Sequence, residues 1–241
     1  MARIDGREND QLRPVEILPG INRFAEGSCL IRCGNTHVLC TASVEERTPP
    51  HVPEGEGWVT AEYSMLPRAN RERSRRDISK LKLSPRSAEI QRLVGRALRA
   101  AVDLKKLGAR TITIDCDVLQ GDGGTRTASV TGGFVALSYA CWKLVEEGVI
   151  PEMPITTCVA AVSAGIVDDV PMLDLCYEED SSAMVDLNCV MNHEGEIIEL
   201  QGTGEGRAFT IAEQRQLVDL CAKGIREIQA IQKAVLEGGD A

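Results

Sequence analysis

Short apolar runs separated by turn residues fill the first third of the chain. Residues 28–33 and 37–44 are two such runs, and the pair Gly34-Asn35 between them readily adopts positive φ angles. This pattern predicts a β-hairpin. Residues 57–63 predict a further strand.

Apolar positions then recur every three or four residues, from Ile90 to Val102, which predicts a helix with one apolar face. Ser84 is a suitable N-cap, Pro85 suits the first helical position, and Gly108 is predicted to end the helix. Three arginines lie mostly off the apolar face: Arg92, Arg96 and Arg99.

A buried strand is predicted next, over residues 111–119, followed by a tight glycine turn at 121–124. Residues 125–147 are mostly apolar all round, which predicts a helix buried on several sides and ended by Gly148.

The second half of the chain, like the first, is predicted to contain several strands followed by a helix. Thr210 and Glu213 form a capping box that opens a last amphipathic helix, and residues 192–195 predict a hairpin turn. The order of strands and helices predicts an α+β fold with helices packed on sheets, in one domain over residues 1–241. Four strands are predicted here, at 156–167, 172–178, 184–191 and 196–201.

Charge and cysteine content narrow the class of protein. The net charge of -9 argues against a basic coat protein for nucleic acid, although local positive charge can still bind phosphodiesters. The nine cysteines are odd in number and include no CxxC pair, so we expect free buried thiols in a reducing, cytoplasmic compartment. No apolar run approaches the ~20 residues of a membrane span, and the polar N-terminus predicts no secretory signal.

The segment from Asp117 to Arg126 is the sharpest chemical motif. A predicted strand is followed by a glycine-rich turn and then by the start of a helix. Backbone N–H groups at such a helix start bind anions. A plain strand-to-helix turn is about equally compatible with the glycines alone. The hydroxyl of Thr125 and the guanidinium of Arg126, directly after Gly124, favour anion binding.

Arg86 is a second candidate for an anion site. It falls in the first turn of its predicted helix, where a cation opposes the helix dipole. Such a placement hints at a bound anion, but taken alone a solvated surface arginine explains Arg86 better.

Carboxylates gather between two predicted strands in the second half. Asp180 and Asp186 could approach each other across a hairpin and hold Mg²⁺, which prefers one or two carboxylates plus substrate oxygens. Without further context, an acidic surface turn is the slightly better interpretation.

Five arginines lie within nine residues, between Arg68 and Arg76, in an otherwise acidic chain. A solvated mobile loop is always an alternative for such a run. The contrast with the net negative charge favours contact with an RNA backbone, with Arg68, Arg71, Arg73 and Arg76 as the candidate residues.

Only three histidines and 3% aromatic residues are present, which disfavours a histidine-based nuclease and a stacking platform for single strands. Inorganic phosphate is already an anion with nucleophilic oxygens. An enzyme that uses it needs a phosphate cradle and a charge-neutralising metal, and catalysis then rests on positioning and electrostatics.

Over almost its whole length the chain resembles the ribonuclease PH family of phosphorolytic exoribonucleases that trim tRNA. The resemblance is specific only when its motifs are taken together. They are residues 7–14, 25–28, 57–68, 89–93, 115–120, 122–129, 179–181 and 201–203.

This resemblance implies roles that composition could not give. Arg86 and Gly124-Thr125-Arg126 match the phosphate-binding positions of the family, and Asp180 and Asp186 match its catalytic carboxylates, associated with Mg²⁺ or Mn²⁺. The arginine-rich stretch matches the region that holds tRNA. The family fold has two similar β-α halves with left-handed βαβ crossovers on mixed sheets, an exception to the usual handedness, and its members form a hexameric ring.

The implied activity is removal of the 3′ trailer of tRNA precursors with release of nucleoside diphosphates, with ribosomal RNA as a further candidate substrate. Pro85, Ser87 and Gly121 depart from the family pattern, which bears on substrate preference rather than on the reaction. Two alternatives stay open. One is a non-catalytic RNA-binding ring subunit, and the other is a small-molecule phosphotransferase, for which no ATP-binding glycine loop is found.

Overall fold

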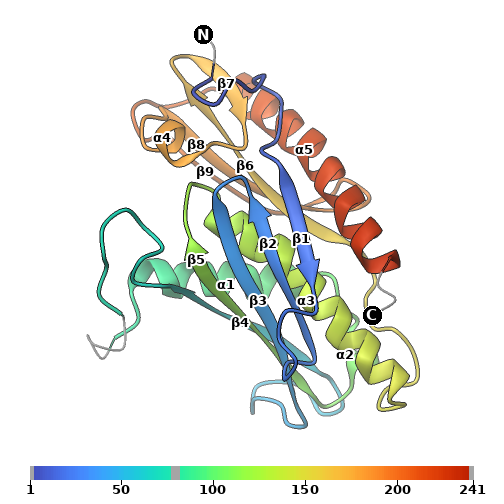
Figure 1. The fold of residues 1–241 in the computed structure, drawn as a ribbon. Coiled ribbons are helices and arrows are strands. Elements are labelled where there is room, and N and C mark those ends of the chain that lie inside the picture. Colours follow the sequence, from blue (N-terminus) through green and yellow to red (C-terminus); the bar gives the residue numbers. More distant parts are fainter. Residues whose placement is uncertain (1–2, 77–81, 239–241) are drawn as a thin grey trace.

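The computed structural model describes residues 3–76 and 82–238. Its N-terminal half is a five-stranded sheet in the order β1-β2-β3-β5-β4 (Figure 1). The β2–β3 hairpin is confirmed, with Gly34 in the turn at φ 54°. β4 runs parallel to β5, so the connection through α1 is a β-α-β crossover. The strands are β1 (Val15–Pro19), β2 (Gly27–Cys33), β3 (Thr36–Glu45), β4 (Trp58–Met65) and β5 (Thr111–Gln120).

Helix α1 (Pro85–Arg99) begins as predicted, with Ser84 accepting a hydrogen bond from the backbone N–H of Ser87. The prediction that it runs to Gly108 is wrong. The helix ends at Arg99, and a separate turn, α2 (Leu104–Leu107), precedes Gly108. Asp103 explains the break, because its side chain caps α2 and favours a new helix start over continuation of the old one.

Helix α3 (Thr125–Glu146) passes between the two sheets and is buried along most of its length (Figure 1). Among the described residues it is the one helix long and apolar enough to cross a membrane, but 78% of the apolar window is buried inside the fold. Such burial is typical of a core helix, as its all-round apolar composition predicted.

The second sheet is antiparallel throughout, in the order β7-β6-β8-β9, and α5 (Ile211–Glu237) packs on it. The capping box of Thr210 and Glu213 is confirmed. The predicted strand over 172–178 is wrong beyond Leu173. The chain turns there and forms the short helix α4 (Tyr177–Asp180). The strands are β6 (Val159–Val167), β7 (Val170–Leu173), β8 (Val185–Asn192) and β9 (Ile197–Thr203).

One hydrophobic cluster joins the two halves. It contains the inward residues of the first sheet and of α3, and also Val159 and Ala161 of β6 and Val190 of β8. The expected free thiols are confirmed, and seven of the nine cysteines are buried, where they pack as small apolar side chains. The α+β fold with two β-α halves therefore has α3 as its shared centre, and both sheets position whatever lies at its N-terminal end.

Candidate active site

The N-terminal end of α3 opens into a polar pocket of about 340 Å³ between the two halves of the molecule. The pocket contains all six residues that the sequence proposed for phosphate and metal, although they are spread over 101 positions of the chain. They come from α1, the glycine turn with α3, α4 and β8. The six are Arg86, Gly124, Thr125, Arg126, Asp180 and Asp186.

Two glycines shape the turn that opens α3 at the pocket. Gly123 and Gly124 have φ angles of 75° and 65°, a region that glycine occupies without strain. A Cβ on Gly123 would lie 2.5 Å from the carbonyl oxygen of Leu175, so this turn packs too closely for any side chain. Gly124 is the N-cap of α3 and provides no side-chain cap in the described structure, which leaves first-turn N–H groups for an anion.

Hydrogen bonds from β3 and the N-terminal segment hold the turn in place. The hydroxyl of Thr36 donates to the carbonyl of Gly123 at 2.6 Å and accepts from the N–H of Asp122 at 2.9 Å. Arg13 donates to the carbonyl of Asp122. The turn is thus fixed from outside the pocket, and its inner side stays open.

The Arg126 side chain is also held from one side. Its Nη1 donates to Glu89 Oε1 at 3.0 Å and to Gln201 Oε1 at 2.9 Å, and Gln201 Nε2 donates to the same Glu89 oxygen at 3.1 Å. These contacts, from α1 and β9, orient the guanidinium at the pocket. Sequence reasoning gave Glu89 and Gln201 no role of their own, although both lie in motifs of the family resemblance.

Tyr63 lies beside Thr125 at the start of α3 and interacts with the guanidinium of Arg86. Its hydroxyl lies 2.8 Å from the hydroxyl of Thr125. Burial raises the pKa of Tyr63, while Thr125 and the guanidinium of Arg86 act in the opposite direction. Tyr63 therefore stays protonated at neutral pH and places an O–H between Arg86 and the start of α3.

The two aspartates face this positive side. Burial and the nearby Asp180 together raise the pKa of Asp186 to about 6, against the opposing effect of Arg126. Burial likewise raises the pKa of Asp180, against Arg86 and Arg126. Asn188 Nδ2 donates to Asp186 Oδ2 at 3.0 Å and orients that carboxylate. The approach is from the end of α4 to β8, not across the hairpin that the sequence predicted.

Asp180 raises the pKa of the neighbouring Asp186, and two carboxylates placed in this way fit a divalent cation. No cluster of three or more His, Cys, Asp or Glu side chains suited to a metal occurs in residues 3–76 and 82–238. A metal here would therefore take Asp180, Asp186 and oxygens from water or substrate, which is the coordination that Mg²⁺ favours.

Three buried arginines near the N-terminus fix α4, which carries Asp180. Arg3 donates to both carboxylate oxygens of Glu179, at 2.8 and 2.6 Å, and Glu179 also caps α4 through the N–H of Cys176. Arg13 donates to both carboxylate oxygens of Asp174, and Arg7 Nη1 donates to the carbonyl oxygen of Asp174 at 3.0 Å. None of these three arginines was singled out from the sequence. Arg7 and Arg13 lie in a segment, residues 7–14, that resembles the family.

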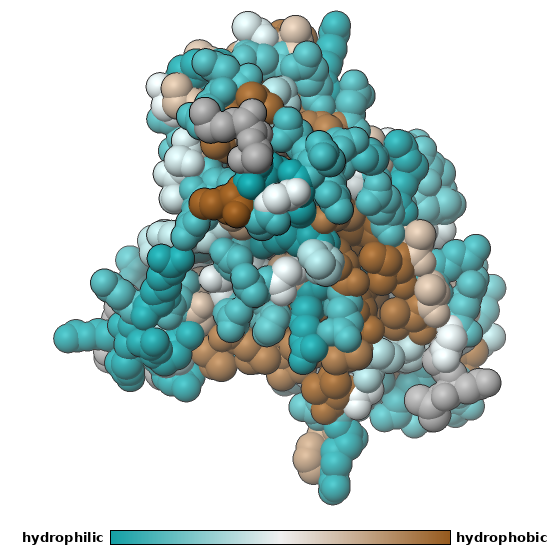
Figure 2. All heavy atoms as spheres, turned by 45° about the horizontal axis from the view of Figure 1, so that its top comes forward, coloured by the Kyte–Doolittle hydropathy of each residue, from teal (hydrophilic) through white to brown (hydrophobic). Residues whose placement is uncertain are grey.

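The arginine loop lies outside the pocket. Arg68, Arg71, Arg73 and Arg76 are exposed on the β4–α1 connection, which projects at the left of Figure 1. Figure 2 shows hydrophilic side chains gathered on the same projection. Arg71 Nη2 pairs with Glu178 of α4 at 2.9 Å, so the loop contacts the helix that carries Asp180. Residues 77–81 lie outside the described structure.

A further groove lies on the helix that carries Arg86. Its volume is about 250 Å³, and Arg92, Arg96 and Arg99 line it beside Trp58. The Arg99 guanidinium stacks over the Trp58 ring at 4.2 Å, and Arg96 pairs with Glu199 at 2.7 Å. As predicted, these arginines lie off the apolar face of α1.

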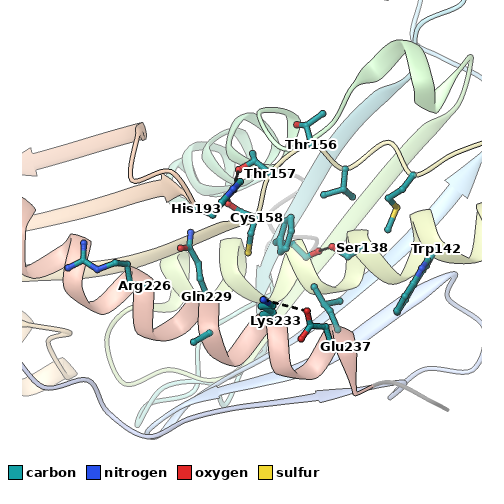
Figure 3. A pocket seen from close by; sticks show the side chains of 15 residues that line it. Ser138, Trp142, Thr156, Thr157, Cys158, His193, Arg226, Gln229, Lys233 and Glu237 are labelled. Atoms are coloured by element: carbon teal, nitrogen blue, oxygen red, sulfur yellow. Dashed lines mark hydrogen bonds and ion pairs between the residues drawn. The ribbon is translucent and has the colours of Figure 1, made fainter.

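A larger groove, of about 850 Å³, lies between α3 and α5 (Figure 3). Its lining is mainly apolar, with Trp142 and Cys158 in the wall and Lys233 turned toward Glu237. Among its described lining residues there is no aspartate and no glycine turn. The smaller polar pocket, with convergent charges and raised pKa values, is therefore the candidate active site.

Two protein-family models match the chain. Residues 11–142 match the model of the 3′ exoribonuclease family, domain 1, and residues 157–223 match that of domain 2. The chain belongs to the 3′ exoribonuclease family. The two models follow the two sheets, and the interpretation of residues 1–241 as a single domain stays a prediction.

The resemblance to ribonuclease PH is confirmed. The chain is 56% identical over 235 residues to Ribonuclease PH of Bacillus pumilus, covering 97% of each chain. It is 53% identical over 237 residues to Ribonuclease PH of Syntrophomonas wolfei, covering 98% of this chain and 99% of the relative. Among solved structures, a chain of an archaeal exosome core is similar with a TM-score of 0.76 and 25% identity, covering 96% of this chain and 91% of that one.

Proposed function

We propose that this chain is a phosphate-dependent 3′→5′ exoribonuclease that shortens the 3′ trailer of tRNA precursors. The observation that carries the proposal is the convergence of Arg86, the Gly124–Arg126 turn and the aspartates Asp180 and Asp186 on one pocket. The relatives named Ribonuclease PH support the same activity.

In this mechanism, Arg86, Arg126 and the N–H groups at the start of α3 hold inorganic phosphate. An oxygen of the phosphate attacks the phosphorus of the last phosphodiester, and the bond from that phosphorus to the 3′ oxygen of the preceding nucleotide breaks. The 3′ oxygen takes up a proton, and the terminal nucleotide leaves as a nucleoside diphosphate. The reverse reaction adds nucleotides to RNA from diphosphates.

Charge must be neutralised where the two phosphorus-bearing anions meet. The arginines do so on one side of the pocket, and Asp180 and Asp186 would hold Mg²⁺ or Mn²⁺ on the other. A bound divalent cation stabilises negative charge on the transferring phosphoryl oxygens. Asn188 keeps the Asp186 carboxylate oriented for that role.

RNA is held outside the pocket by the arginine loop and by assembly. Arg68, Arg71, Arg73 and Arg76 lie on an exposed projection that contacts α4 through Arg71. We propose a cytoplasmic homohexameric ring, which would bring the arginine loops of several copies to one RNA and offset the net charge of -9. Ribosomal RNA is a second candidate substrate.

The test is an RNA with a short 3′ extension, incubated with and without inorganic phosphate. Phosphate-dependent release of nucleoside diphosphates is expected, and none from an Asp186→Asn variant. Equal release of nucleoside monophosphates in both reactions would show hydrolysis and overturn the proposal. A parent protein that binds RNA but releases nothing would leave the non-catalytic ring subunit, an alternative disfavoured because all six site residues are present together.

A further inference from the structure

Ser163 lies in the wall of the candidate active site with a hydroxyl that nothing satisfies. It belongs to β6, its residue is 4% exposed, and it lines the same pocket as Arg126 and Asp186. Ser163 Oγ has no hydrogen-bond partner among the described residues. A buried hydroxyl without a partner destabilises a protein, so we expect a group that accepts its hydrogen bond.

The neighbouring polar side chains do not provide a partner. Ser163 pairs with Asn188 in the β6–β8 register, and Asp186 follows two residues away on the same face of the sheet. The side-chain amide of Asn188 does not bond to Ser163; its Nδ2 donates to Asp186 at 3.0 Å. The partner of the Ser163 hydroxyl must therefore come from the pocket.

The charges around the pocket indicate what that partner is. The same pocket contains the proposed anion cradle of Arg86, Thr125 and Arg126, with the first-turn N–H groups of α3. An O–H that faces a bound anion donates to it, and hydrogen bonds to charged groups are the stronger ones. Ser163 then completes a ring of donors around the anion on the side of the second sheet.

We propose that Ser163 donates a hydrogen bond from Oγ to an oxygen of inorganic phosphate bound in this pocket and is a further substrate-binding residue. This inference rests on the proposed phosphorolytic function. The shared chemistry is a phosphate oxygen, which free phosphate and the terminal phosphodiester of RNA both offer, and the experiment below separates the two.

The first measurement uses the full-length protein and inorganic phosphate alone, without RNA. Ser163→Ala should melt at the same temperature as the parent or higher in phosphate-free buffer, because the unsatisfied hydroxyl is gone. Its affinity for phosphate, from the rise in melting temperature with phosphate concentration, should fall about tenfold.

Ser138→Ala is the matched control, since Ser138 is equally buried, at 4%, but its hydroxyl donates to the carbonyl of Phe134 at 2.8 Å. It should leave phosphate affinity unchanged. Ser163→Cys keeps the size of the side chain with a weaker donor, and should give an intermediate phosphate affinity in a folded protein.

In the phosphorolysis assay, Ser163→Ala should raise the KM for phosphate about tenfold and leave the affinity for RNA without phosphate unchanged. A loss of RNA affinity with normal phosphate affinity would assign the hydroxyl to the phosphodiester and overturn the inference. So would a lower melting temperature with an unchanged phosphate titration, which would make Ser163 a structural residue. Failure of the proposed function looks different: the parent itself would then show no phosphate-dependent release, whatever its phosphate affinity.

Discussion

The guanidinium of Arg13 holds both carboxylate oxygens of Asp174, with Nε 3.0 Å from Oδ2 and Nη2 2.7 Å from Oδ1. Both side chains are buried, and Asp174 has a φ of 52°, in the left-handed region. Arg13 also donates to the carbonyl of Asp122 in the glycine turn. This pair therefore links the phosphate side of the pocket to the chain segment that leads into α4 and Asp180.

Replacing Arg13 by Ala should lower the free energy of unfolding by about 3–5 kcal/mol, because it leaves the Asp174 carboxylate buried without its main partner. Urea denaturation measures the change. The control is Arg47→Ala, which breaks an exposed pair with Glu45 and should leave the midpoint unchanged. Equal midpoints for both variants would show that the Arg13 pair does not stabilise the fold.

Acid should weaken the same contact. Burial raises the pKa of Asp174, but Arg13 and Arg7 more than offset it, so the pKa lies below its ordinary value of 3.8. A carboxyl with a lowered pKa stabilises the folded state above the unfolded pKa, and this contribution is lost as the pH falls below it through the folded pKa. Asp174→Asn should thus be less stable than the parent at pH 7, with a difference that shrinks below about pH 4. Urea titrations from pH 7 to pH 2.5 test this, and a constant difference would contradict it.

Arg126→Gln should lower kcat for phosphate-dependent turnover by about 10²–10³, because a positive charge positioned in the pocket is lost. Binding of RNA, measured without phosphate, should change little. Arg32→Gln is the control, since Arg32 is half-exposed and pairs with Glu16 on the first sheet. If Arg126→Gln retained parental turnover, the phosphate cradle would be misassigned.

Binding of Mg²⁺ should release a proton. Because burial and Asp180 raise the pKa of Asp186 to about 6, the metal-free carboxyl takes up a proton as the pH falls through that value. A metal needs the ionised form, so Mg²⁺ affinity should fall steadily below about pH 6. Calorimetric titrations at pH 5.5 and pH 7.5 test this. Asp186→Asn should abolish binding at both values, and Asp219→Asn, an exposed change on α5, should leave it intact.

The arginine loop should set the salt dependence of RNA binding. Each contact with a phosphate of single-stranded RNA contributes about 0.7 to the magnitude of the slope of log affinity against log salt concentration. Changing Arg68, Arg73 and Arg76 together to Gln should therefore reduce that magnitude by about 2. Filter binding at several salt concentrations measures the slope. Arg215→Gln on α5 should not alter it, and an unchanged slope in the triple variant would place the RNA elsewhere.

Local chemistry made much of this structure predictable. The β2–β3 hairpin, the start of α1, the glycine turn and the capping box of α5 each depend on residues within a few positions of one another. Gly123 and Gly124 are the clearest case, because their positive φ angles follow from the residue type. The candidate residues for phosphate and metal came from such local motifs together with the family resemblance.

Contacts between distant segments were not predictable in this way. Arg13 and Asp174 are 161 positions apart, and no local pattern pairs them. Such distant contacts also explain why the predicted strand over 172–178 is wrong. The chain turns at Asp174, which Arg13 holds, and Glu179, which Arg3 holds, caps the short helix α4. Ser163 is the one hydroxyl residue in the otherwise apolar strand β6, and its place at the pocket follows only from the three-dimensional structure.

The central place of α3 has a consequence for how the pocket works. Its N-terminal turn cannot shift without moving the helix on which both sheets pack. The donors that face the pocket are therefore organised when the protein folds and not when phosphate arrives, so little reorganisation free energy is spent at each turnover. A substitution deep in α3 that displaces the helix should for this reason displace these donors as well.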